Sequence, residues 1–438
     1  MPARQWAGEK ARVDPAAERL APLLCQLVNY ERTRPDARLW DLATMRAFLQ
    51  RPGALPCPRP AVQVGGSKGK GTTSALLARL AQAAGLRPGF YSSPHVTTLL
   101  ERIRVDGRDI ATGDLERILR GVLAAPGERA PTFFEAMTLA AAQHFCEQAV
   151  DLAIWEVGLG GRHDATSAMP VDASIVTTIE LEHTDVLGDT IAAIAGEKAP
   201  VVRPGGVGFT GCSGEALATI RGHCAAVGAE LRVLGEHFGL RDVRLDGDGA
   251  RGRLWLADGD DRPFFLPGAA AFELPALALA AAAFAQVLPA APLRLDPVLR
   301  PELPCRFEVR AEPDGEVLVL DGAHTEQSLR AVVAELARRW PGRRATFLVG
   351  SAAGKRWREA FSAVAAAADT VVATAVSGTS SEAPSVIATY FTARGVPCTV
   401  AADAAAGLRE LRRRPGPRVV TGSFYLAGEV RRALDASN

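Results

Sequence analysis

A glycine-rich segment with two lysines and two threonines offers the chemistry of a phosphate site. Glycines let backbone N–H groups turn inward around an anion, Lys70 adds a positive charge, and Thr72 or Thr73 offers a hydroxyl group to a magnesium ion. The strict P-loop pattern has Ser or Thr directly after its lysine, whereas Gly71 intervenes here. The alternative is an ordinary turn between a strand and a helix. The residues predicted to bind a nucleotide are Gly66, Ser67, Lys68, Gly69, Lys70, Gly71, Thr72 and Thr73.

Four polar residues further along the chain could converge on this loop. They are Ser93, Glu156, His183 and Lys198, and each follows or ends a predicted strand or lies one helix later. The carboxyl edge of a parallel sheet is where such folds bind ligands, and a carboxylate and an imidazole there could hold magnesium against nucleotide phosphates. Taken singly, a histidine or a lysine is more often structural or solvated. Glu156 differs, because a carboxylate within Ile154-Trp155-Glu156-Val157 is costly to bury without a cation.

Two further candidates lie in the last third of the chain. Asp321-Gly322-Ala323-His324 ends an apolar strand, and Arg306 stands in Pro304-Cys305-Arg306-Phe307-Glu308. Both could reach across a cleft toward a ligand. The alternative is that Asp321 caps the helix beginning near Glu326 and that Arg306 pairs with a surface acid.

Strands alternate with helices over most of the chain, which is typical of an α/β fold with a parallel sheet. We expect helices within residues 14–50 and a proline-rich linker over 51–60. Residues 206–265 predict antiparallel strands at the edge of the sheet, and 274–285 a buried helix. The remaining elements expected before residue 200 are strands near 62–64, 89–93, 152–157 and 173–179 and helices at 74–84, 132–148 and 191–198.

A second strand and helix series follows the proline-rich stretch 289–304. Its expected strands are 317–320, 345–350, 370–375, 398–400 and 418–422. We therefore predict a boundary near residue 295. The N-terminal domain, 1–295, is a P-loop-type domain with a mostly parallel sheet, and residues 296–438 form a smaller Rossmann-like α/β domain.

Composition excludes several classes of function. Lys plus Arg number 50 and Asp plus Glu 49, so the net charge of +1 gives no electrostatic footprint for nucleic acid or a membrane surface. The seven cysteines are scattered without a Cys-x-x-Cys pair, which indicates reduced thiols. The longest apolar run is about a dozen residues, short of the roughly 20 that a membrane helix needs. The first ten residues lack the apolar core of a signal peptide, so a cytoplasmic protein is expected.

Many short motifs, in order, resemble the folylpolyglutamate synthase/dihydrofolate synthase branch of the Mur ligase family. That family's loop ends Gly-Lys-Gly-Ser/Thr, which accounts for Gly71. The motifs that carry the resemblance are Gly65 to Thr72, Ser93-Pro94-His95, Glu101-Arg102-Ile103-Arg104, Thr132-Phe133-Phe134-Glu135-Ala136, Glu156 to Arg162, Asp164-Ala165-Thr166, His183-Thr184, Leu187-Gly188, Glu197-Lys198-Ala199, Arg306-Phe307-Glu308, Asp321 to His324 and Thr421-Gly422-Ser423.

The resemblance implies an ATP-dependent ligase that makes an acyl phosphate and joins L-glutamate to dihydropteroate or a folate. It implies that Lys70 holds the phosphates, that Thr72 and Glu156 bind magnesium, and that His183 and Ser93 complete a second metal site. Lys198 matches the lysine that the family carbamylates. Arg306 and Asp321 would approach the nucleotide, and His324 the transferred phosphate. Small-molecule substrates and a monomer are expected, with folate biosynthesis and one-carbon metabolism as the setting.

Several positions depart from the family pattern. Ala270-Ala271-Phe272-Glu273-Leu274-Pro275 lacks the usual His-Gln pair and the Asn that approaches the nucleotide base. Lys68 stands for an Asn, Glu182 for the Asp before the metal-site His, Cys305 for a glycine, and Thr325 for an Asn. Two alternatives therefore stay open. One is a ligase with a non-folate carboxylate acceptor, and the other is a nucleotide-binding module without ligase activity.

Overall fold

The computed structural model describes residues 14–29, 41–51, 57–125, 129–298, 300 and 303–436. These residues form two compact units. The larger contains the described residues of 19–95 and 100–300, and the smaller contains 14–18, 96–99 and 303–436. The larger unit thus continues some residues past the predicted boundary near 295. In the predicted N-terminal helical region, α1 (Pro15–Leu24) and α2 (Ala43–Gln50) are present, whereas 30–40 and 52–56 lie outside the described residues.

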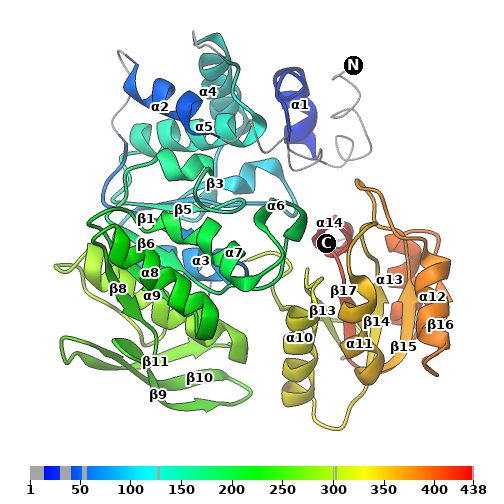
Figure 1. The fold of residues 1–438 in the computed structure, drawn as a ribbon. Coiled ribbons are helices and arrows are strands. Elements are labelled where there is room, and N and C mark those ends of the chain that lie inside the picture. The colour runs from blue at the N-terminus through cyan, green and yellow to red at the C-terminus, as the bar shows by residue number, and fades with distance from the viewer. Residues whose placement is uncertain are drawn as a thin grey trace. The chain divides into compact units, whose positions relative to one another are not determined.

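An eight-stranded, mostly parallel sheet forms the centre of the larger unit (Figure 1). Its strand order is β4-β3-β2-β5-β1-β6-β7-β8. The short strands β3 and β4 pair antiparallel at one edge. The strand bounds are β1 Ala61–Gly65, β2 Pro88–Tyr91, β3 Ile103–Val105, β4 Arg108–Asp109, β5 Leu152–Glu156, β6 Ala173–Val176, β7 Val207–Thr210 and β8 Glu230–Val233. The predicted α/β architecture with a mostly parallel sheet is confirmed.

Strands β2, β5, β1 and β6 lie side by side and are buried over their whole length. Continuous apolar runs suit them, because helices cover both faces of a parallel sheet. Their registers pair Val64 with Glu156 and Gly65 with Val176. The carboxyl ends of these parallel strands therefore lie side by side, along what we call the carboxyl edge of the sheet. The segments that follow the strands are brought together there.

Helices connect these strands and include the expected buried helix near 274. That helix, α9, carries its own alanine and leucine side chains on every face, and most of its residues are buried. The other helix bounds are α3 Lys70–Ala83, α4 Thr112–Ala124, α5 Phe133–Glu147, α6 Thr184–Leu187, α7 Ile191–Lys198, α8 Gly214–Ala226 and α9 Leu274–Val287.

The prediction for 206–265 was wrong in part. Strands β7 and β8 are parallel to their neighbours in the main sheet, because helix α8 connects them as a crossover. Only the last three strands of this region are antiparallel, and they form a sheet of their own, visible below the main sheet in Figure 1. These strands are β9 Phe238–Leu245, β10 Gly249–Leu256 and β11 Asp261–Pro267.

The motif Thr132-Phe133-Phe134-Glu135 has a structural role at the start of α5. Thr132 Oγ1 accepts a hydrogen bond from Glu135 N at 3.2 Å, and Glu135 Oε2 accepts one from Thr132 N at 2.7 Å. This reciprocal capping box satisfies two N–H groups that the helix itself leaves unbonded.

We expect Thr132→Ala to lower the free energy of unfolding by about 1 kcal/mol, because it removes the cap. Urea denaturation followed by circular dichroism measures this change. Thr389→Ala is the matched control, since Thr389 is an exposed residue inside α12 (Pro384–Thr392). Equal losses in the two variants would contradict a specific capping effect.

The smaller unit contains a six-stranded sheet of order β12-β13-β17-β14-β15-β16, parallel except for β12. Alternate residues of strand β13 point to opposite faces of the sheet. Val319 packs against helices α10, α11 and α12 on one face. Leu318 and Leu320 pack against α13 and α14 on the other face. The unit is thus a three-layer α/β sandwich, and the predicted α/β fold of the C-terminal domain is confirmed. Its bounds are β12 Glu308–Ala311, β13 Val317–Leu320, α10 Glu326–Arg339, β14 Ala345–Val349, α11 Trp357–Ala367, β15 Ala368–Ala373, α12 Pro384–Thr392, β16 Cys398–Val400, α13 Ala404–Arg412, β17 Arg418–Thr421 and α14 Phe424–Asp435.

All seven cysteines are free thiols. Within the described part of the chain, no helix combines the length and the apolar character that crossing a bilayer requires.

Candidate functional site

The glycine loop after β1 is held by the segment that follows β6. Ser67 N donates to Thr178 O at 2.7 Å, and Lys68 N donates to Thr178 Oγ1 at 3.0 Å. Thr177 Oγ1 in turn donates to Lys68 O at 2.6 Å. Gly66 has φ of 129°, and a Cβ there would lie 2.1 Å from Thr177 Oγ1, so only glycine fits this close approach. Hydrogen bonds within the protein therefore fix the shape of the loop.

Helix α3 begins directly at the loop and points its N-terminus into it. Gly69 is the N-cap residue, in the left-handed conformation, and no side chain caps the helix. The first N–H groups of α3 are thus available to an anion. Lys70 Nζ lies 2.9 Å from Gly66 O. Thr72 is half-buried, whereas Thr73 is fully buried and its Oγ1 has no hydrogen-bond partner among the described residues.

Glu156 and Ser93 meet at the same edge of the sheet. Glu156 is the last residue of β5 and only 3% exposed, and its Oε2 lies 3.4 Å from Ser93 N, which follows β2. Because β5 is the direct neighbour of β1, this buried carboxylate stands beside the strand that carries the loop. Ser93 and Glu156 therefore both lie at the carboxyl edge of the sheet, as expected from the sequence.

Lys198 lies under the loop in a cluster of charges. Its side chain is 2% exposed, and Nζ is 3.1 Å from Gly66 O and 3.1 Å from Glu182 Oε1. Lys68 Nζ lies 3.2 Å from the other oxygen, Glu182 Oε2. Burial, together with the nearby Lys70 charge, lowers the pKa of Lys198 to about 8. Burial alone would raise the pKa of Glu182, but Lys198, Lys68 and Lys70 lower that pKa to about 2.

The low pKa of Glu182 predicts a contribution to stability that depends on pH. Because its pKa falls from 4.5 in the unfolded chain to about 2 in the folded chain, the unfolded chain binds more protons between these values. The contribution is present above pH 4.5 and is lost as the pH falls toward 2. Denaturant unfolding at several pH values should show a smaller loss of stability on acidification for Glu182→Gln than for the parent. Identical slopes for both proteins would contradict the ion pair.

His183 has a different placement from the buried acids. It is exposed, it adopts the left-handed conformation with φ of 48°, and it is the N-cap residue of the short helix α6. Its charge contributes to the lowered pKa of Glu182, its neighbour. His183 follows β6, so it belongs to the same edge as the loop.

The candidates in the smaller unit gather around the end of β13. Asp321 is buried, and its two oxygens accept hydrogen bonds from Phe307 N and Ala323 N, both at 2.7 Å. The guanidinium group of Arg306 lies 3.9 Å from the centre of the Phe424 ring. His324 Nδ1 lies 3.0 Å from Gly322 O.

The alternative that Asp321 caps the following helix was wrong. Thr325 is the N-cap residue of α10, and its Oγ1 accepts a hydrogen bond from Ser328 N. Asp321 instead fixes the two backbone segments that carry Arg306 and His324. Its carboxylate therefore positions both of these side chains within the smaller unit.

Some residues of the site escaped sequence reasoning. Glu182 was noted only as a departure from the family pattern, and Thr177, Thr178 and Phe424 were not singled out. The two threonines follow β6, so the strand order would have identified them as neighbours of the loop. No sequence signal indicated that Phe424 lies against Arg306.

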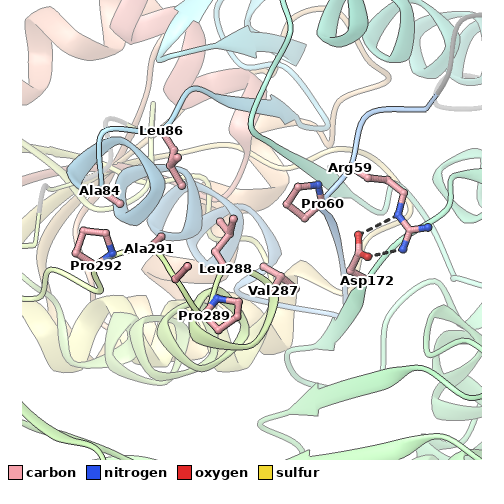
Figure 2. Close-up of a pocket in the computed structure, with 11 residues that line it drawn as sticks. Arg59, Pro60, Ala84, Leu86, Asp172, Val287, Leu288, Pro289, Ala291 and Pro292 are labelled. Carbon is pink, nitrogen blue, oxygen red and sulfur yellow. Dashed lines mark hydrogen bonds and ion pairs between the residues drawn. The ribbon is translucent and has the colours of Figure 1, made fainter.

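The loop does not coincide with the pocket in Figure 2. That pocket has a volume of about 710 Å³ and lies among residues that precede β1 and β6 or follow α3 and α9, at the opposite edge of the sheet. Arg59 and Asp172 pair on one of its walls.

The pocket also shows in which direction helix α9 runs. Helices α3 and α9 contact each other and both end at the pocket, so they run parallel. Because α3 starts at the glycine loop, the start of α9 lies on the same side of the sheet as the loop. Ala270, Ala271 and Leu274, which replace the expected base contacts, are at that start.

The family model for the Mur ligase glutamate ligase domain matches residues 305–423. A probable bifunctional folylpolyglutamate synthase/dihydropteroate synthase from Halobacterium salinarum is 38% identical over 295 residues, 63% of this chain and 34% of that protein. A dihydrofolate synthase/folylpolyglutamate synthase from Escherichia coli is 39% identical over 193 residues, 44% of this chain and 45% of that protein. The matched part thus spans less than half the length of either relative.

A solved structure of a bifunctional folylpolyglutamate synthase/dihydrofolate synthase from Yersinia pestis, complexed with AMPPNP and Mn ion, is similar over nearly the whole chain. The TM-score is 0.78 at 27% identity, covering 96% of this chain and 98% of that one. Residues 305–423 thus match the glutamate ligase domain of Mur ligases, and the chain is similar in sequence and fold to folylpolyglutamate synthase/dihydrofolate synthases.

Proposed function

We propose that this protein is an ATP-dependent ligase that joins L-glutamate to dihydropteroate, to a folate, or to both. One observation carries the proposal. A buried carboxylate, Glu156, stands beside a pre-built phosphate loop at the carboxyl edge of a parallel sheet. Such an arrangement suits the transfer of a phosphoryl group, which depends on positioning and charge neutralisation.

The reaction divides among residues of this chain. The N–H groups at the start of α3 and the Lys70 ammonium group would bind the β- and γ-phosphates of ATP. The acceptor carboxylate would take the γ-phosphoryl group and become an acyl phosphate, with ADP as the leaving group. The neutral amino group of glutamate would then attack the acyl carbon, so that the C–N bond of the amide forms, the C–O bond to phosphate breaks, phosphate leaves and the nitrogen gives up one proton.

Magnesium fits the donors at this edge. Mg²⁺ is held in proteins by one or two carboxylates together with waters and substrate phosphates, so it needs no large cluster of side chains. Among the described residues, no group of three or more His, Cys, Asp and Glu side chains forms a metal cage. Thr72 would hold one ion, and Glu156, with His183 and Ser93, a second. When bound, magnesium would neutralise the phosphate charge.

Lys198 is the proposed site of carbamylation. A lysine with a pKa near 8 has an appreciable neutral fraction at physiological pH, and a neutral amine is the form that reacts with carbon dioxide. Its burial under Gly66 keeps it beside the loop. A carbamate would turn this cation into an anion that can support a metal ion.

Residues of the smaller unit would complete the site. We assign the ATP-binding part to residues 1–295 and the ligase part, with Arg306, Asp321 and His324, to 296–438. Arg306 and Asp321 would approach the nucleotide, and His324 the transferred phosphate. Closure of the two parts around the substrates would then gate the reaction. The protein is proposed to work in the cytoplasm as a monomer.

A panel of acceptors tests the proposed substrates. The purified protein, with ATP, magnesium and glutamate, receives dihydropteroate, tetrahydrofolate or a set of unrelated carboxylates, and mass spectrometry scores the products. We expect a mass gain of one glutamyl residue on a pterin acceptor. Ligation only to carboxylates without a pterin would replace the folate assignment, and nucleotide binding without ligation to any acceptor would support a binding module.

A further inference from the structure

Two departures from the family pattern lie in direct contact. Lys68 stands in the glycine loop and Glu182 directly before His183, and the resemblance implies Asn and Asp at these two positions. They are far apart in the sequence, yet Lys68 Nζ lies 3.2 Å from Glu182 Oε2. A Lys in place of Asn adds a charge, and a Glu in place of Asp adds reach. Each change suits the other.

The contact closes a ring of interactions around the loop. Glu182 uses its second oxygen to bind Lys198 Nζ at 3.1 Å, and Lys198 Nζ also reaches Gly66 O at 3.1 Å. Lys68 and Gly66 belong to the loop, Glu182 to the segment after β6, and Lys198 to the end of α7. One carboxylate therefore ties the tip of the loop to the buried lysine beneath it.

Burial makes this ring more than a surface ion pair. The side chain of Glu182 is 12% exposed and that of Lys198 only 2%, whereas Lys68 is 27% exposed. Removing one partner from a buried carboxylate leaves charge uncompensated, which costs far more than breaking an exposed pair. If Lys198 becomes carbamylated, Lys68 is the cation that stays in contact with Glu182. A neutral Asn at position 68 has no charge with which to compensate the carboxylate of Glu182.

We propose that Lys68 is a positioning residue, which acts through Glu182 to hold the phosphate loop and Lys198 in their working arrangement. This inference rests on the proposed function for its effect on catalysis, but its effect on the loop can be measured without any acceptor. A lysine that merely contacted phosphate would act independently of Glu182. The coupling between positions 68 and 182 is therefore the decisive quantity.

A double-mutant cycle measures this coupling. The variants are Lys68→Asn, Glu182→Asp and the double variant, which restores the family's pair, together with Lys68→Arg. Isothermal titration calorimetry gives the dissociation constant of Mg·ADP, and kcat is measured where ligation is present. We expect each single change to weaken Mg·ADP binding about tenfold, and the double variant to bind within about threefold of the parent. Lys68→Arg should stay near the parent value.

A surface pair of similar composition provides the control. Arg117 and Glu147 pair between α4 and α5 with Nη2 and Oε2 2.6 Å apart, and the Arg117 side chain is 53% exposed. The cycle Arg117→Asn, Glu147→Asp and their double variant should leave Mg·ADP binding unchanged. Circular dichroism establishes that all variants are folded.

Additive effects at positions 68 and 182, or no effect of Lys68→Asn on binding, would overturn the inference. Because Mg·ADP binding needs no acceptor, a coupled cycle in a protein without ligase activity would support the positioning role while rejecting the proposed reaction. Active ligation together with additive effects would support the proposed reaction and reject the positioning role of Lys68.

Discussion

Lys70→Ala is expected to lower kcat for ligation by about two to three orders of magnitude, because it removes the cation of the loop that is proposed to bind the phosphates of ATP. Lys70 Nζ bonds to Gly66 O and Ser67 O at 2.9 and 3.4 Å, so its side chain curls back over the loop rather than into solvent. Mg·ATP binding should weaken as well. Steady-state phosphate release and calorimetric titration measure the two effects separately.

The control for Lys70 is Arg120→Ala. Arg120 is an exposed residue of α4 that pairs with Glu116, and its loss removes one positive charge from the same unit. Activity should stay at the parent level in this variant. If Lys70→Ala retained parent activity, the glycine loop would not be the phosphate site.

Glu156→Gln is expected to abolish ligation, with a loss on the order of a thousandfold in kcat, while the fold is kept. Gln preserves the size and one acceptor oxygen of the side chain, so the contact with Ser93 N can survive. What is lost is the negative charge that a divalent cation needs. Because the charged form of a buried carboxylate is costly without a cation, the variant should unfold at the same temperature as the parent or higher. Discontinuous activity assays measure kcat, and thermal denaturation measures the unfolding temperature.

Glu147→Gln serves as the control for this change. Glu147 ends α5 and its carboxylate pairs with Arg117 at the surface, so the same chemical replacement there should leave kcat unchanged. Loss of activity at Glu156 accompanied by a large loss of thermal stability would point to a structural role for that carboxylate. Such a result would contradict its assignment to the metal.

The fold was largely predictable because its main signals are local. Buried strands such as β5 and β6 are mostly apolar, and glycine and proline mark the turns between them. Strand alternating with helix then implies parallel pairing, which aligns the strand ends. This is why Ser93 and Glu156 could be placed at one edge from sequence alone.

The errors arose where pairing depends on contacts that are distant in sequence. Val207–Thr210 and Glu230–Val233 are as short as strands of an antiparallel meander, and only the intervening helix α8 makes them parallel. The roles of side chains near the loop were hidden for the same reason. Lys68 was predicted from the sequence only to bind the nucleotide, whereas the structure pairs it with Glu182, which follows another strand.

Departures from a family pattern were informative once they could be located. Thr325, at a position where the resemblance implies Asn, caps α10 through its own hydroxyl group. Leu274 and its alanine neighbours begin a buried helix on the side of the loop and offer apolar side chains there. The departures at the loop, Lys68 and Glu182, are polar and contact each other, whereas those at the start of α9 are apolar.

The acyl phosphate is the central claim, and transfer of labelled oxygen tests it most directly. The acceptor carboxylate is labelled with ¹⁸O, and the phosphate released during glutamate-dependent ligation is analysed by mass spectrometry. Attack of the carboxylate on ATP, followed by amide formation, predicts one ¹⁸O atom in each phosphate released. Unlabelled phosphate accompanying amide formation, or no glutamate-dependent amide from any pterin carboxylate, would contradict the account.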